Sequence, residues 1–291
     1  MSALHGLEYL LTSLWLGGLF FHGWIVPAAP AAAPRDSNWS RGALLRLGWA
    51  FFGFSLAWCF VLAAEMSDSW QISEITSAIL VTRFGHLWCL RLGLALVSLL
   101  LLRTARIRTA FFVSLSLPLL SSFVGHAGSQ LHSTWISWTV ILDFVHFVGV
   151  SLWSGGLVAL FSWLSRWNRR TPQLAERDLS HRVVERFSKL AMTSTGALAA
   201  AGLTLAITYG VDPFHPWGTN YGLLVLAKIA LFGLALAAAA INQFIHLKRW
   251  DPEKERAFSR GIYREVGVEI LLMIAVFFVA GFLTRTDLPG S

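Results

Sequence analysis

The chain has 291 residues, of which 55% are hydrophobic and only 13% are charged, and its net charge at pH 7 is +7. Soluble globular domains carry about 25% charged residues, so the composition excludes an ordinary soluble protein and indicates a chain that lies mainly in lipid. A basic chain can bind nucleic acid, but here the basic residues lie in short loops between apolar segments, and no nucleic-acid-binding motif is present. We therefore expect the lipid bilayer, and no nucleic acid, as a partner.

Eight apolar segments follow one another along the chain, each about the 20 residues that a helix needs to cross a bilayer. All eight are expected to be helical, because an open strand leaves its backbone polar groups unpaired in lipid. They are residues 3–26, 46–64, 83–102, 109–127, 138–163, 190–209, 221–246 and 265–284. The sequence predicts an all-α integral membrane protein of about eight transmembrane helices, without a separate soluble domain.

The loops alternate in charge. The loop after the third segment contains Arg103, Arg106 and Arg108, whereas the preceding loop, residues 65–82, is acidic and contains no Lys or Arg. The same alternation continues to the last segment. Because basic loops stay on the cytoplasmic side, we expect a multi-pass protein of the bacterial inner (plasma) membrane with both termini periplasmic.

An internal repeat divides the chain. Residues 13–19, Ser-Leu-Trp-Leu-Gly-Gly-Leu, return as Ser-Leu-Trp-Ser-Gly-Gly-Leu at 151–157, and a second match relates residues 82–91 to 219–228. The first segment is therefore expected to be a retained helix rather than a cleaved signal peptide, because its counterpart lies in mid-chain. Two similar matches in the same order predict two four-helix repeats, residues 1–133 and 134–291, within one membrane domain. Four helices is an even number, so the halves are expected to be parallel, about a pseudo-two-fold axis along the membrane normal.

Ionisable residues gather near the outer ends of the predicted helices, where such groups usually have a role. Asp143 and His146 are three residues apart and share one helix face. His5 and Glu8 occupy the equivalent positions in the first repeat, and His126 ends the fourth segment. Imidazole and carboxylate together suit zinc or oxidised copper. The predicted metal site consists of His126, Asp143, His146, His5 and Glu8.

Five further residues are predicted to support this site or to lie on a pathway. Arg91 and Lys228 are equivalent in the repeat, and each needs a partner inside a helix bundle, with Glu8, Asp143 or Glu65 as candidates. Glu269, near the cytoplasmic end of the last segment, is a further candidate for the pathway. The set is Lys228, Arg91, His132, His86 and Glu269, although packing or an interfacial position is also a sufficient explanation for His132 and His86.

These motifs resemble one known family. Gly125-His126-Ala127, the run from Asp143-x-x-His146 to Trp153-x-Gly155-Gly156-Leu157, and Tyr221-Gly222-x-Leu224-x-x-x-Lys228 are similar to the CopD/PcoD copper-resistance proteins of bacterial inner membranes. The resemblance implies eight spans and movement of copper from periplasm to cytoplasm, often beside a periplasmic copper-binding partner, CopC. It also implies that His126, Asp143 and His146 handle the copper ion.

We therefore expect a copper-handling protein that transports copper, of either oxidation state, from a periplasmic-side His/Asp site along a route between the halves. One alternative is a haem-binding electron-transfer protein with His126 and His146 as axial ligands. Another is a copper-delivery or assembly factor that does not transport. We do not expect an enzyme, because the sequence contains no activated nucleophile or phosphate-binding loop.

Overall fold

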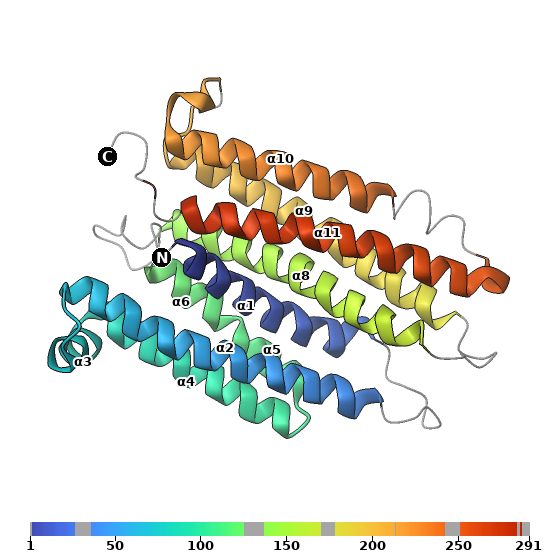
Figure 1. Cartoon of the computed structure of the whole chain (residues 1–291), viewed down its shortest axis with the longest axis horizontal. Helices are drawn as coiled ribbons and strands as arrows, with labels where there is room; N and C mark the ends of the chain where they lie inside the picture. Colours follow the sequence, from blue (N-terminus) through green and yellow to red (C-terminus); the bar gives the residue numbers. More distant parts are fainter. Residues whose placement is uncertain are drawn as a thin grey trace.

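The computed structural model describes residues 2–26, 36–124, 137–169, 178–212, 214–241, 251–283 and 286. Long helices run side by side, and no strand occurs in these ranges (Figure 1). The helices are α1 (Ser2–Phe20), continued by the π-helical turn η1 (Phe21–Ile25), α2 (Asp36–Ser67), α3 (Ile72–Val81), α4 (Arg83–Arg103), α5 (Ile107–Ser114), α6 (Ser116–Val124), α8 (Trp138–Trp167), α9 (Leu179–Thr208), α10 (Asn220–Ile241) and α11 (Glu255–Leu283). Short 3-10 turns occupy Pro216–Gly218 and Pro252–Lys254.

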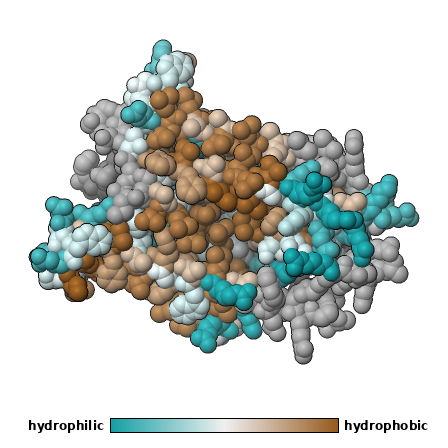
Figure 2. Space-filling model, viewed as in Figure 1, coloured by the Kyte–Doolittle hydropathy of each residue, from teal (hydrophilic) through white to brown (hydrophobic). Residues whose placement is uncertain are grey.

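Six of the described helices are long and apolar enough to cross a membrane: α2, α4, α8, α9, α10 and α11. In space-filling view an apolar band covers the middle of the bundle and hydrophilic residues lie toward its ends (Figure 2). The other two predicted segments are also helical: α1 with η1, and α5 with α6, which spans 107–123 as a shorter apolar helix. The protein is a multi-pass helical membrane protein.

The helices define two ends of the bundle. At the N-terminal face, α1, α4, α8 and α10 begin and α2, α6, α9 and α11 end (Figure 1). The basic face is the opposite end, and it takes its name from the arginines and lysines on the helix ends and turns there: Arg103, Arg106, Arg108, Arg166, Arg169, Arg182, Lys254, Arg256 and Arg260.

One helix was not expected. The acidic loop at 65–82 contains the ten-residue helix α3, which lies crosswise beside the ends of α2 and α4 (Figure 1). Ile75 and Ala78 on its inner side pack against Ala63 and Ala64 of α2. The segment is too short to span a bilayer, and its amphipathic pattern buries one face on the protein.

The centre of the fold is a close parallel contact between α1 and α8. A Cβ atom at Gly17 would lie 2.2 Å from the Ser151 carbonyl oxygen, and one at Gly155 would lie 2.0 Å from that of Ser13. Only glycine permits this approach of two backbones, which is the usual function of small residues between membrane helices. Three pairs of positions that the repeat equates meet along the contact: Tyr9 with Phe147, Ser13 with Ser151, and Gly17 with Gly155.

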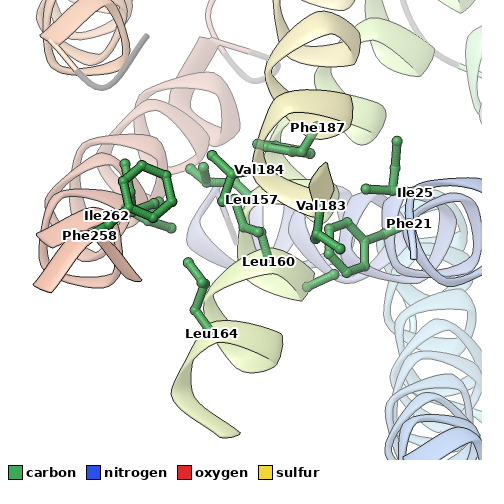
Figure 3. Packing of buried hydrophobic residues seen from close by; sticks show 12 residues of the cluster. Phe21, Ile25, Leu157, Leu160, Leu164, Val183, Val184, Phe187, Phe258 and Ile262 are labelled. Atoms are coloured by element: carbon green, nitrogen blue, oxygen red, sulfur yellow. The ribbon is translucent and has the colours of Figure 1, made fainter. Parts of the chain in front are cut away.

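At the basic face, η1 joins the first half of the chain to the second. Phe21 and Ile25 belong to a buried apolar cluster that also contains Val183 and Phe187 of α9 and Ile262 of α11 (Figure 3). The α1 helix is therefore fixed at its middle by the glycine contact and at its end by this cluster.

Candidate metal site

Asp143 and His146 lie one turn apart on α8, near the N-terminal face, and both line a cavity of about 160 Å³. Lys228 of α10 reaches the same cavity. The space lies where the two halves meet, since α1 and α6 also contribute to its wall. The remaining lining residues are Tyr9, Pro118, Ser121, Phe147, Val150, Tyr209, Tyr221, Val276, Phe277, Ala280 and Leu283.

The His146 ring is held in one orientation. Its Nδ1 lies 2.8 Å from the carbonyl oxygen of Leu198, which only accepts, so Nδ1 carries the proton. Its Nε2 lies 3.4 Å from Nζ of Lys228, whose ammonium group only donates. A Cβ atom at Gly202 would lie 2.8 Å from the ring, so α9 closes its other side. An imidazole whose Nδ1–H is bound to a backbone carbonyl, with its Nε2 lone pair on the site side, is the arrangement that metal-binding histidines use.

Glu8 belongs to a different cluster. Its carboxylate forms a buried ion pair with Arg91 of α4, and Arg91 also donates to Thr12 Oγ1 over 2.9 Å. The Arg91 guanidinium lies over the rings of Trp88 and Phe51, at 5.1 and 5.5 Å from their centroids. Of the three partners considered for Arg91, the structure places Glu8 beside it.

The five predicted metal ligands are thus not brought into one group within the described residues. Asp143 and His146 share the cavity, while His5 packs edge-to-face on Trp58 and Tyr9, beside the Glu8 cluster. No group of three or more His, Cys, Asp or Glu side chains in the described ranges is placed to hold a metal ion. His126 falls outside those ranges, so the complete set stays a prediction.

The supporting residues also separate. Lys228 lines the cavity and Arg91 pairs with Glu8. His86 is exposed at the start of α4, with Nε2 2.7 Å from the Leu80 carbonyl oxygen, and is not among the residues of the cavity wall. Glu269 is buried on α11 and lines a second cavity, nearer the basic face. His132 lies outside the described residues.

Tyrosines are the part of the cavity that the sequence reasoning did not identify. The chain contains four tyrosines, and three of them, Tyr9, Tyr209 and Tyr221, line this one cavity. They come from α1, the end of α9 and the start of α10. A rare residue type recurring at the same predicted depth in three segments was the available signal.

The fold and this cavity define a class: a multi-pass helical membrane protein with half-buried ionisable side chains around a cavity near one face. Two family models extend the classification. Residues 1–138 match the model for the copper resistance protein D-like N-terminal domain, and residues 181–283 match the model for copper resistance protein D. The matches cover most of the chain in the expected order, so the protein belongs to the copper resistance protein D family, and the resemblance found in the sequence is confirmed.

The similar individual proteins are consistent with this family assignment. The chain is 28% identical to the copper transport protein CutJ of Bacillus subtilis strain 168, over 92% of this chain and 50% of the relative. It is 26% identical to copper resistance protein D of Pseudomonas syringae pv. tomato, over 67% and 63% of the two chains. It is also 26% identical to the inner membrane protein YebZ of Escherichia coli K12, over 70% of each chain. The chain thus spans half the length of the Bacillus relative. No solved structure matches it.

Proposed function

We propose that this protein is a copper carrier of the bacterial inner membrane that accepts copper in the cavity of Asp143 and His146. Its family and relatives are named for copper resistance and copper transport. The observation that carries the proposal is His146: Leu198 fixes its Nδ1, and its Nε2 lone pair faces Lys228 in a cavity that also contains a carboxylate. Imidazole and carboxylate are ligands that oxidised copper accepts.

The metal site that we propose is narrower than the sequence prediction. The carboxylate of Glu8 is already neutralised by Arg91 and hydrogen-bonded by Thr12, so it offers little net attraction for a second cation. In the equivalent place of the second half, Lys228 contacts an imidazole instead. Asp143 and His146 are therefore the proposed copper ligands, with His126 as the proposed third, and His5 and Glu8 are assigned to the separate cluster around Arg91.

We further propose eight spans in two parallel repeats, residues 1–133 and 134–291. The contact of α1 with α8 supports this arrangement, because equivalent positions meet there. The starts of α4 and α10 support it independently. Thr82 Oγ1 accepts from Gly85 N over 3.1 Å, and Thr219 Oγ1 accepts from Gly222 N over 3.0 Å. The same cap at equivalent positions is what two related halves would retain.

The basic face is proposed to be cytoplasmic, because loops rich in Lys and Arg remain on that side. The N-terminal face, with the cavity, then opens to the periplasm. A CopC-like periplasmic protein is the proposed donor of copper to this face. In this arrangement the protein binds and moves a metal ion and catalyses no covalent reaction.

Metal analysis of the purified protein tests the site. His126→Ala, Asp143→Ala and His146→Ala are each expected to weaken copper binding by roughly tenfold or more, because each removes a ligand. His215→Ala, an exposed histidine of the loop before α10, is the matched control and is expected to bind as the wild type does. Unchanged copper affinity in all three site variants would refute the assignment.

Two further measurements separate the alternatives. Copper uptake into proteoliposomes distinguishes a carrier from a delivery factor, which would bind copper without moving it. The absorption spectrum of the purified protein tests the haem alternative, since a bound haem gives a Soret band and a copper carrier does not.

A further inference from the structure

The contact between α1 and α8 does not leave room for a route between these two helices. At Gly17 a Cβ atom would lie 2.2 Å from the Ser151 carbonyl oxygen and 2.6 Å from the Gly155 Cα atom. The two backbones touch at this level, and Ser151 donates to Ser13 Oγ one turn nearer the N-terminal face. An ion cannot pass between α1 and α8 there, so a path toward the basic face must lie elsewhere.

A second cavity indicates where such a path lies. It has a volume of about 210 Å³ and lies among α8, α9, α10 and α11. A single water molecule needs roughly 15 Å³ of comparable volume, so this space has room for a hydrated ion or several small groups. Most of its wall is apolar, and the one charged group among its described lining residues is the carboxylate of Glu269, which is 3% exposed. Ser188, Met192 and Thr195 of α9 add hydroxyl and thioether groups.

The two cavities follow one another along the same helices. On α8 the first ends at Val150 and the second begins at Trp153, less than one turn later. On α11 the order is reversed, as its direction requires: Glu269 lines the second cavity and Val276 the first. The second cavity is thus the continuation of the first toward the basic face.

One apolar layer separates them. Trp153, Leu198 and Ala235 are its buried members, and Phe232 and Leu272 pack against them. The rings of Trp153 and Phe232 meet edge-to-face, with centroids 5.5 Å apart. An apolar constriction between two cavities excludes ions until its side chains move.

The first half has a different interior at the equivalent place. Trp15, the counterpart of Trp153, is fully buried and donates from Nε1 to Ser114 Oγ over 3.0 Å. The spacing that makes Arg91 the counterpart of Lys228 also makes Ala95 the counterpart of Phe232. The aromatic pair therefore belongs to the second half, and ring packing rather than a hydrogen bond to a neighbouring hydroxyl closes the layer.

We propose that the cation path runs inside the second half, among α8, α9, α10 and α11, with Trp153 and Phe232 as its closed barrier. Glu269 is the cation-binding group on the far side of the barrier. A carboxylate on a low-dielectric wall attracts a cation, and the Met192 thioether suits reduced copper. The inference rests on the proposed transport function and assigns a second metal-binding position to it.

Thiol labelling tests the barrier without copper. Ala239→Cys places a thiol in the second cavity, in a background that carries Cys59→Ser and Cys89→Ser. A membrane-impermeant methanethiosulfonate reagent is applied to each side of the membrane separately. From the N-terminal face, Phe232→Ala is expected to raise the labelling rate by about tenfold or more, because it removes half of the aromatic barrier.

Trp153→Phe is the second barrier variant, chosen because it keeps an aromatic ring in the layer and is expected to fold. An intermediate increase in labelling supports the proposal. An unchanged labelling rate in both folded variants overturns it, and so does faster labelling of a Ser13→Cys thiol instead, since that result would place the path between the halves.

Copper uptake tests Glu269. Glu269→Gln is expected to reduce the rate of uptake into proteoliposomes by roughly tenfold, with copper binding at the Asp143 and His146 cavity unchanged and partial recovery in Glu269→Asp. Glu265→Gln, one turn away on α11 and not part of the cavity wall, is the control. If the wild type takes up no copper, the proposed function fails. If the wild type transports and Glu269→Gln transports equally, only the present inference fails.

Discussion

Replacing Arg91 with alanine is expected to destabilise the protein strongly, because Glu8 would be left as a buried charge without its partner. Both side chains are almost completely enclosed, with 2% and 3% of their surfaces exposed. Removing one member of such a pair costs about 3–5 kcal/mol. The loss of ring contacts with Trp88 and Phe51 acts in the same direction.

The double variant Glu8→Gln with Arg91→Met separates charge from packing. It removes both charges while retaining much of the side-chain volume, so it is expected to recover most of the loss, since a buried ion pair is often no more stabilising than an uncharged replacement. A free-energy difference of about 3–5 kcal/mol corresponds to between two and four powers of ten in the unfolding equilibrium, at roughly 1.4 kcal/mol per tenfold.

Reversible unfolding in mixed detergent micelles, followed by circular dichroism, measures these differences. Lys189→Ala is the matched control, because its pair with Glu185 is exposed on α9, and exposed pairs contribute about 1 kcal/mol or less. Equal stability losses for Arg91→Ala and Lys189→Ala would refute the reasoning. A double variant as unstable as Arg91→Ala would show that ring packing, not charge, is responsible.

Three further changes have expected outcomes. Gly17→Leu is expected to lower the free energy of unfolding by about 1–3 kcal/mol or to prevent folding. Gly53→Leu on α2, where a Cβ atom would have nothing within 4 Å, is the control and is expected to be tolerated. Equal thermal stability of the two variants in detergent would contradict the glycine contact. Lys228→Met is expected to tighten copper binding by about tenfold or more, because it removes a positive charge 3.4 Å from His146 Nε2; isothermal titration showing unchanged or weaker affinity would count against that location of the ion. Glu255→Ala is expected to lower stability by about 1–3 kcal/mol, since this buried carboxylate accepts hydrogen bonds from two neighbouring side chains. If the variant unfolds in micelles at the same detergent concentration as the wild type, these hydrogen bonds do not stabilise the fold.

The helical segments could be predicted because their signal is strong. A run of about 20 apolar residues in a chain with few charges has few other structures available in lipid. The helix α3 was missed because a short amphipathic segment beside acidic residues resembles a loop in composition. Its helix is stabilised by contacts with α2, which lie outside its own sequence.

The candidate site was only partly predictable. The i, i+3 spacing placed Asp143 and His146 on one face of a helix correctly, because helix geometry alone decides it. Whether Glu8 faces the same cavity depends on which basic or polar neighbour pairs with it, and in the structure that neighbour is Arg91 of α4. That choice depends on the depth and rotation of two helices, which a single sequence does not specify. The tyrosines did carry a signal, their rarity and similar depth, but their meeting in one cavity depends on the same helix rotations.

If the two halves are repeats, as proposed above, the contacts of Tyr9 with Phe147 and of Gly17 with Gly155 have an evolutionary consequence. A symmetric dimer of identical four-helix chains brings each position near its axis against its own copy, so a substitution there changes both sides of the contact at once. Positions away from the axis meet other positions rather than their own copies, and after fusion into one chain each of the two copies can change without the other. Arg91 with Glu8 and Lys228 with His146 have that freedom. In the proposed two-repeat arrangement, the pair of Arg91 with Glu8 is structural, and the equivalent pair of Lys228 with His146 is the one proposed to take a ligand.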